Sequence, residues 1–355
     1  MRVEKIALHE LDEFIKSDQY KQFEEKPLTP MRAASYLRNP HARPGDNVLY
    51  MMLERTKLIA FRTLFADKIT GDDEPFAWLS GNWVDPEYRR HGYSEKLLEE
   101  AFSDWNGRLM FTNYAPTSLN LYLKSGKFEP IHSDHGVRFY LFAKPSKLLQ
   151  ERMPNWKFFL YFFDFLVLIV ASLKTMFFTT KHITDFETKT IKEPDEECLK
   201  LLKSNAGQTL FNRGKKSFKW IFSNPWISTV DKRFIDNYPF SSFSKAFRYE
   251  TLKIYTENKF EGFILYSIRD KHLKALYSTL NGELLKTAAQ HLSNLAAKER
   301  IEIMTILDPI LAEAVSSSKN PFIKTMNIEH RIYSSFKLER GNKKIQAGDG
   351  DFVFS

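Results

Sequence analysis

The chain has 355 residues, of which 43% are hydrophobic and 27% are charged, and its net charge is +8. This length predicts two domains, and the composition is that of a globular protein, which argues against a disordered chain. A surplus of surface lysines is the favoured explanation of the basic balance, but a basic chain also favours phosphate ligands, nucleic acid or an anionic membrane as partners.

Cysteine use and the N-terminus bear on the compartment. Cys198 is the single cysteine, so no disulfide can form within the chain, as is usual in a reducing cytoplasm. It follows the acidic run 195–197, which disfavours a thiolate, and we expect it to be inert. No cysteines and histidines have metal-site spacing, so no metal is expected. The first residues lack the apolar core of a signal peptide, and we predict a cytoplasmic protein.

The first 150 residues alternate strand and helix patterns. Alternating apolar positions predict strands, and apolar positions three and four apart predict helices. A helix after residue 86 carries Leu97, Leu98, Ala101, Phe102 and Trp105 on one face. The other predicted elements are strands at 2–10, 76–84, 108–114 and 136–143, two strands within 47–69 joined by a turn at 54–57, and helices at 11–25 and 116–125.

The second part of the chain repeats this order of elements. The motif at 300–306 resembles 108–114, and 330–336 resembles 137–143, in pattern rather than in identity. We therefore predict a tandem repeat of one α/β (α+β) fold, each copy with a mixed, mostly antiparallel sheet flanked by helices. The predicted strands are 252–256, 262–268, 271–280, 300–306, 330–336 and a terminal strand within 347–355, and the predicted helices are 283–299 and 309–318.

This repeat sets the predicted domain limits. The first domain is 1–150 and the second is 191–355, and they are joined by a hydrophobic connecting helix within 151–190.

The stretch DPEYRRHGYSEKLLEEAF, residues 85–102, predicts an anion site between a strand and a helix. The first N–H groups of a helix have no intrahelical partner, and the helix dipole favours an anion there. Gly92 lets the backbone approach closely, Ser94 is small and can donate its hydroxyl, and Arg89 and Arg90 add positive charge. A solvated basic turn is the alternative interpretation.

These residues resemble the acyl-CoA-binding motif of the GNAT N-acetyltransferase superfamily, Arg/Gln-x-x-Gly-x-Gly/Ala, with Ser94 in place of the last small residue. The lead-in VDPEYR and the downstream TNYAPTSLNLYLKSGKF are similar to the same family. The resemblance implies acetyl-CoA, or another acyl-CoA, as co-substrate and a backbone N–H near residues 82–84 that polarises the thioester. The implied CoA-binding residues are Val84, Arg89, Arg90, His91, Gly92, Tyr93, Ser94 and Asn113.

The resemblance also implies a general acid at Tyr122, which would protonate the leaving thiolate, although a tyrosine among leucines could equally belong to the core. No general base is assigned. The acidic residues near the predicted strand 76–84 read as exposed turn positions, and Ser80 could hold a relaying water. The acidic candidates are Asp72, Asp73, Glu74 and Glu87.

The second copy is expected to be non-catalytic. Its corresponding loop lacks the motif and carries Glu283 where the first copy has arginine, and a carboxylate there would take the place of a phosphate. Aligning the two copies places Ala314 opposite Tyr122. We therefore expect this domain only to complete the acceptor cleft.

The segment WKFFLYFFDFLVLIVASLKTMFF, residues 156–178, is unusually apolar. Its apolar centre is short, Asp164 would be costly in lipid, and a span would separate two halves that should pack together, so a membrane span is rejected. Three interpretations stay open: a helix buried between the domains, a lid over an apolar substrate, or a helix in peripheral contact with the inner face of the membrane, which the neighbouring lysines would suit.

The favoured function is acyl-CoA-dependent transfer of an acyl group to the amine of a small molecule or peptide, with no nucleic acid involved. One alternative is a relative of the Fem transferases, which have tandem GNAT-like domains and use aminoacyl-tRNA at the membrane. Another is a non-catalytic, membrane-associated protein that binds CoA. Closely spaced aromatic residues in 218–227 indicate either core packing or an acceptor groove.

Overall fold

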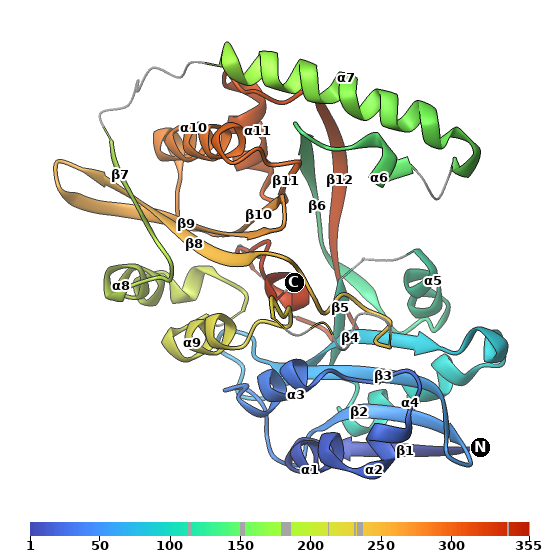
Figure 1. Ribbon diagram of the computed structural model, residues 1–355. Coiled ribbons are helices and arrows are strands. Elements are labelled where there is room, and N and C mark those ends of the chain that lie inside the picture. The colour runs from blue at the N-terminus through green and yellow to red at the C-terminus, as the bar shows by residue number, and fades with distance from the viewer. Residues whose placement is uncertain are drawn as a thin grey trace.

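The computed structural model describes residues 1–112, 116–149, 153–178, 186–211, 213–230, 232, 237–338 and 341–354 (Figure 1). The first half contains strands β1 (Arg2–Ala7), β2 (Asn47–Glu54), β3 (Lys57–Asp67), β4 (Phe76–Val84), β5 (Leu109–Thr112) and β6 (Glu129–Tyr140), and helices α1 (Leu11–Lys16), α2 (Asp18–Gln22), α3 (Pro30–Leu37), α4 (Tyr93–Asp104), α5 (Pro116–Lys124) and α6 (Pro145–Leu149).

The second half begins with the long helix α7. Its strands are β7 (Glu187–Ile191), β8 (Phe247–Thr256), β9 (Lys259–Arg269), β10 (His272–Ser278), β11 (Ile303–Ile306) and β12 (Lys324–Ser334), and its helices are α7 (Lys157–Met176), α8 (Glu196–Ser204), α9 (Lys215–Ser223), α10 (Gly282–Lys298) and α11 (Pro309–Ser317).

One twelve-stranded sheet runs through both halves in the order β1-β2-β3-β4-β5-β12-β6-β11-β10-β9-β8-β7. In the first half, β1 to β4 are antiparallel neighbours and β5 pairs parallel with β4. In the second half, β7 to β10 are antiparallel neighbours and β11 pairs parallel with β10. The first five strands of each half therefore share one order and one set of directions, which confirms the tandem repeat of an α/β fold.

The sixth strand of each half is exchanged with the other half. β6 pairs with β11, and β12 pairs with β5, while β6 and β12 also pair with each other over most of their length. Figure 1 shows these two strands side by side, running from one half of the molecule into the other. The sequence predicted the strand at 136–143 as the last one of the first domain, but it completes the sheet of the second half. The boundary near residue 150 stays a prediction, because the sheet is continuous.

Some predicted elements differ in extent or type from those observed. The helix predicted over 11–25 is interrupted at Ser17, which has an extended backbone and whose Oγ accepts a hydrogen bond from the Tyr20 N–H at 3.2 Å, so that it caps α2. The predicted terminal strand is instead a 3₁₀ helix, Gly350–Phe354. Its last ring stacks on Trp226 at a centroid distance of 4.5 Å, and burial of Phe354 in the core favours the compact turn.

Helices cover both faces of the sheet, as the periodicity predicted. α4 buries Leu97, Leu98 and Ala101 against β2, β3 and β4. The opposite face of the first half is covered by α1, α2 and α3, and its core continues into α8 and α9 of the second half. α10 and α11 cover the second-half sheet. Trp220 and Trp226, which raised the choice between core and acceptor groove, are both buried in the shared core.

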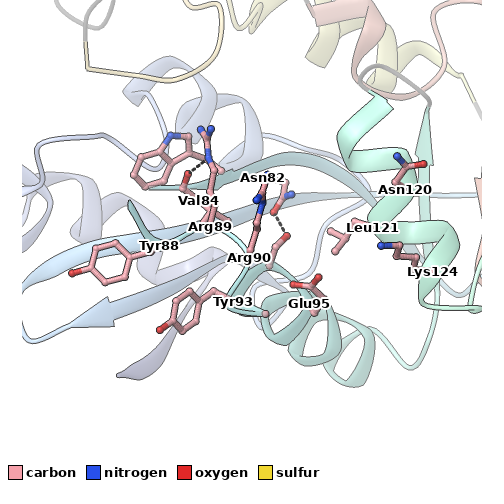
Figure 2. A pocket seen from close by; sticks show the side chains of 13 residues that line it. Asn82, Val84, Tyr88, Arg89, Arg90, Tyr93, Glu95, Asn120, Leu121 and Lys124 are labelled. Atoms are coloured by element: carbon pink, nitrogen blue, oxygen red, sulfur yellow. Dashed lines mark hydrogen bonds between the residues drawn. The ribbon is translucent and has the colours of Figure 1, made fainter. Parts of the chain in front are cut away.

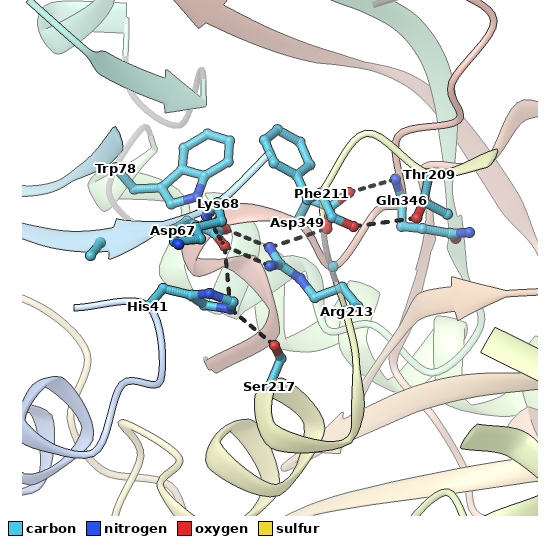
Figure 3. Close-up of polar contacts among 12 residues, drawn as sticks. His41, Asp67, Lys68, Trp78, Thr209, Phe211, Arg213, Ser217, Gln346 and Asp349 are labelled. Carbon is cyan, nitrogen blue, oxygen red and sulfur yellow. Dashed lines mark hydrogen bonds and ion pairs between the residues drawn. The ribbon is translucent and has the colours of Figure 1, made fainter. Parts of the chain in front are cut away.

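A buried ion network also joins the halves (Figure 3). Arg213, whose side chain is 8% exposed, donates to both carboxylate oxygens of Asp67 at 2.8 and 2.7 Å and lies 3.3 Å from Asp349 Oδ1. Trp78 Nε1 donates to Asp67 at 2.8 Å. Burial acts to raise the pKa of Asp67, but Arg213 outweighs it and holds that pKa below its ordinary value, whereas burial raises the pKa of Asp349 to about 7.

His41 and Ser217 lie at the edge of this network without forming a hydrolase-type triad. His41 Nε2 is 2.9 Å from Ser217 Oγ and 3.9 Å from Asp67 Oδ1, so one ring nitrogen serves both contacts. A triad needs the carboxylate on the other nitrogen, where it orients the ring. Burial lowers the pKa of His41, and the group serves to pack the two halves together.

Candidate active site

The site is built where β4 separates from β5. The two strands pair in parallel only at Ala77↔Leu109 and Trp78↔Met110. The register of β4 against β3 shifts between Leu79 and Gly81, which leaves Ser80 at a β-bulge. Beyond that point β4 continues to Val84 with β3 on one side alone, so its other edge is open. The open edge includes residues 82–84, where the resemblance implied a backbone N–H for the thioester.

The loop after β4 and the first turn of α4 line the same space. Gly92 is the N-cap residue of α4 with φ +77°, a left-handed conformation, and a Cβ built on it would meet nothing within 4 Å. Arg90 is also left-handed, with φ +68°. Arg89 Nε donates to the Val84 carbonyl at 3.2 Å. Glycine is therefore required here for its backbone, and the open side is where a ligand would approach.

Asp85 anchors the start of this loop. Its Oδ1 accepts a hydrogen bond from the Glu87 N–H at 3.0 Å, and its Oδ2 pairs with Lys57 at 2.9 Å. Partial burial acts to raise the pKa of Asp85, but the Lys57 contact outweighs it and holds that pKa below its ordinary value. The turn is thereby fixed before α4 begins.

A cavity of about 500 Å³ lies between this loop, the end of β4 and α5 (Figure 2). It brings together most of the predicted loop residues and adds Asn82, Trp83, Tyr88, Glu95, Asn120, Leu121 and Lys124. Cations therefore line two sides, since Lys124 on α5 faces the cavity from across the arginine loop. Glu95, in the first turn of α4, brings one negative charge. The predicted residues that line it are Val84, Arg89, Arg90, Gly92, Tyr93 and Ser94.

A buried cation lies beneath the floor of this cavity. Arg62 on β3 is 0% exposed, and its guanidinium donates to Asn82 Oδ1 at 3.2 Å and to the carbonyl and Oγ of Ser94 at 3.2 Å each. Its Nη1 donates to Tyr122 Oη at 2.9 Å, whereas its buried Nε–H has no hydrogen-bond partner within the described residues. All these partners are neutral, and within the described residues Arg62 pairs with no carboxylate. A buried charge without a counter-charge is costly, so an anion bound at the α4 N-terminus would offset it.

Tyr122 lies in the core below the cavity rather than on its wall. It is 5% exposed, its ring contacts Phe111 at a centroid distance of 4.3 Å, and its hydroxyl accepts the bond from Arg62. Arg62 in turn contacts Ser94, which lines the cavity. Arg62 therefore stands between the Tyr122 hydroxyl and the groove, and the role of Tyr122 as a general acid stays a prediction.

The other predicted residues are placed as follows. His91 is exposed, its Nδ1 lies 3.2 Å from the Tyr88 carbonyl, and it does not line the cavity. Asn113 lies outside the described residues. Among the possible bases, Asp72 pairs with Arg108, Glu74 pairs with Arg43, and Glu87 lies near Lys57 on the outer side of the loop.

One carboxylate that the sequence did not single out approaches β4. Asp351 Oδ2 accepts a hydrogen bond from Ser80 Oγ at 2.7 Å. Ser80 also accepts a bond from Arg32 on α3, so this cluster lies on the face opposite to Asn82 and α4. Within the described residues, Oδ1 of Asp351 has no hydrogen-bond partner. The part of the chain that the structure describes contains no group of three or more His, Cys, Asp or Glu residues that could hold a metal.

The second half fills the equivalent space with its own chain. β10 pairs with β11 only up to Lys274↔Thr305. Beyond that pair the C-terminal segment satisfies β10: the Gly348 N–H donates to the Leu276 carbonyl at 2.7 Å, and the Ser278 N–H donates to Gln346 Oε1 at 3.0 Å. Glu283 lies in the first turn of α10 and pairs with Lys286. This part of the second half therefore leaves no groove like the one beside β4.

Residues 8–126 match the family model of the Acetyltransferase (GNAT) family, which confirms the resemblance to GNAT proteins over this part of the chain. No curated protein sequence matches the chain.

Among solved structures, the chain is 12% identical to a probable N-acyltransferase from Enterococcus faecalis V583, with a TM-score of 0.49, covering 94% of this chain and 72% of that one. It is 10% identical to a tandem GNAT protein from the clavulanic acid biosynthesis pathway, with a TM-score of 0.48, covering 95% of this chain and 99% of that one. A putative acetyltransferase from Pyrococcus horikoshii is 12% identical, with a TM-score of 0.46, covering 98% of this chain and 93% of that one. At 10–12% identity and TM-scores of 0.46–0.49 these structures are only loosely similar to the chain, and the match to the GNAT family is the one over residues 8–126.

Proposed function

We propose that the protein transfers an acyl group, acetyl in the simplest case, from coenzyme A to the amine of a small molecule or peptide. The observation that carries the proposal is the buried guanidinium of Arg62 under a groove whose mouth holds the α4 N-terminus, Arg89, Arg90 and Lys124. Cations and free N–H groups converge there on one place, which suits the pyrophosphate of CoA.

The open edge of β4 provides a path from that mouth toward the reaction centre. Pantetheine would extend along the edge between Val84 and the bulge at Ser80, where β5 no longer pairs. A backbone N–H of this edge would polarise the thioester carbonyl. The amine then attacks the carbonyl carbon, the C–S bond breaks, the thiolate takes up one proton, and the amine loses one.

Asp351 is the group that we assign as proton acceptor. Its bond from Ser80 holds the carboxylate against β4, and Oδ1 is left for a proton from the amine. Arg32 and Trp226, whose ring lies 3.9 Å from the guanidinium carbon, fix this face of the strand. The acceptor would therefore approach from the side of α3, opposite to the CoA groove, and Tyr122 is retained as candidate acid.

Two conservative substitutions test these roles. Asp351→Asn and Tyr122→Phe keep shape but remove the base and the acid, and each is expected to lower kcat by about 100-fold while the Kd for acetyl-CoA stays the same. Thiol release with a panel of amines gives kcat, and calorimetry gives Kd. Full turnover by Asp351→Asn would remove the base assignment. Full turnover by Tyr122→Phe would make Tyr122 a core residue.

The stoichiometry of binding tests the function more broadly. The C-terminal segment occupies the second-half space, so titration with acetyl-CoA is expected to give one equivalent per chain. Binding without thiol release for any amine would leave a non-catalytic CoA-binding protein. No binding at all, or two equivalents, would contradict the site described above.

A further inference from the structure

The helix α7 exposes an apolar surface that nothing in the described part of the chain covers. Burial of this helix between the halves, one interpretation of the sequence, is wrong: Phe158 is 89% exposed, and most neighbouring apolar side chains are exposed too. α7 also contributes no residue to the lining of the CoA groove, so it is not a lid over that groove. The exposed apolar residues are Trp156, Phe158, Phe159, Tyr161, Phe162, Phe163, Phe165, Leu166, Leu168, Ile169, Val170, Leu173, Met176 and Phe177.

A narrow inner stripe attaches α7 to the second half. Leu160 and Ala171 are buried, and Ala171 belongs to the core that includes α10 and α11. Asp164, the single acidic residue of α7, turns inward and accepts hydrogen bonds from the N–H and Oγ of Ser146 on α6. Lys174 Nζ donates to the Phe322 carbonyl. Asp164 and Lys174 thus hold the helix against the protein, and the apolar groups stay outside.

The sheet topology prevents this helix from crossing a bilayer alone. By length and composition α7 could span a membrane. However, β6 precedes α7 and pairs with β11 and β12, which follow it, while β12 pairs with β5. Both halves must therefore lie on one side of any membrane. In Figure 1, α7 lies along one outer face of the molecule, above the ends of β6 and β12.

The width of the apolar surface distinguishes lipid from a protein partner. At about 100° per residue, the exposed apolar residues occupy an arc of roughly 220° around the helix. A partner helix covers a stripe of about 100°, so a second copy of the chain would leave much of the surface in water. Immersion in the interfacial layer of a bilayer covers the whole arc. Trp156 and Tyr161 are residues that favour that layer.

The surrounding charges suit an anionic surface. Lys157 begins α7 and Lys144 precedes α6, and both are exposed without a carboxylate partner in the described residues. The nearby Glu302 is already paired with Lys147 at 3.1 Å. We propose that α7 lies in the plane of a membrane and binds lipid bilayers that contain anionic phospholipids, through its apolar arc and these flanking lysines.

This orientation leaves the CoA groove in water. The groove is built by β4, α4 and α5 of the first half, whereas α7 packs on the second half (Figure 1). Membrane binding is therefore independent of the proposed acyl transfer, and either proposal can fail without the other.

Flotation with liposomes tests the proposal. The full chain is expected to float with vesicles of phosphatidylcholine and phosphatidylglycerol and to remain below vesicles of phosphatidylcholine alone. Phe158→Asp combined with Phe162→Asp should lower the bound fraction at least about tenfold, because both side chains are exposed and lie on the outer arc. The same substitutions should shift the melting temperature by less than about 2 °C, as expected for surface positions.

A matched control distinguishes the loss of the apolar surface from the general effect of adding a negative charge. Val230→Asp changes a residue that is also 89% exposed but lies away from α7, and it should float as the unchanged protein does. Lys144→Glu combined with Lys157→Glu should weaken binding to the anionic vesicles. No flotation, equal flotation with both vesicles, or full flotation of the double aspartate variant would each overturn the proposal. A dimer in solution that this variant converts to a monomer, without flotation, would assign the surface to a second copy.

Discussion

Replacing Gly92 by aspartate is expected to weaken acetyl-CoA binding by about 100-fold, which corresponds to roughly 2.7 kcal/mol. Gly92 is left-handed and open on the side of the groove, so the new carboxylate would project to where the pyrophosphate is expected. The carboxylate would repel the phosphates and compete with them for the N–H groups at the start of α4. Calorimetric titration of both proteins with acetyl-CoA measures the effect.

Gly71 offers the matched control for backbone strain. It is also left-handed, with φ +87° and nothing within 4 Å of a Cβ, but it lies in the turn between β3 and β4, away from the groove. Gly71→Asp introduces the same charge and the same strain, and its affinity for acetyl-CoA should not change. If Gly92→Asp binds as well as Gly71→Asp does, the loop is not the phosphate site.

Replacing Arg213 by methionine is expected to destabilise the protein by about 3–5 kcal/mol, because it leaves two buried carboxylates without their cation. Asp67 is buried at 1% exposure and bonded to both guanidinium nitrogens of Arg213. Lys215→Met is the control: Lys215 is near in sequence and pairs with Glu196, but both side chains are 68% exposed, so its loss should cost less than about 1 kcal/mol. Urea unfolding measures both.

The pH dependence of the Arg213 variant supplies a second measure. In the unchanged protein the pKa of Asp67 is lowered, so its contribution to stability is present above the unfolded pKa and is lost as pH falls through the folded value. Without Arg213, burial alone would raise that pKa, and stability would instead be lost as pH rises. The difference in free energy of unfolding should therefore grow between acidic and neutral pH. A difference that stays small and constant would show that the network contributes little.

The loop and α4 could be predicted from the sequence because the information is local. Glycine, serine and arginine at fixed spacing before an amphipathic helix define a backbone conformation and a charge, and the structure places Gly92 and Arg89 accordingly. The core face of α4 likewise follows from its periodicity, since Leu97, Leu98 and Ala101 are buried.

The rest of the site depends on contacts between distant residues. Asp351 and Ser80 are far apart in the sequence, and no local pattern predicts their contact. Arg62 could have been noticed in the sequence, because it is a charged residue within the apolar run LIAFRTLFA, and this pattern indicates a buried cation with a function.

The strand exchange could not be predicted, because alternation shows that a segment is a strand but not which strand lies beside it. The position of α7 was equally hidden, since a helix that is apolar nearly all round has no face that points inward by periodicity.

The exchange of β6 and β12 affects how the protein can be made. A ribosome releases β5 long before β12, and at roughly 5–20 residues per second the delay of about 220 residues lasts some tens of seconds. During that time one edge of β5, and the edges of β6, have no partners, although the rest of the first half can already collapse. An unpaired strand edge attracts other chains. The nascent first half is therefore the stage at which chaperones would matter most, and its own missing strand is the last one to be synthesised.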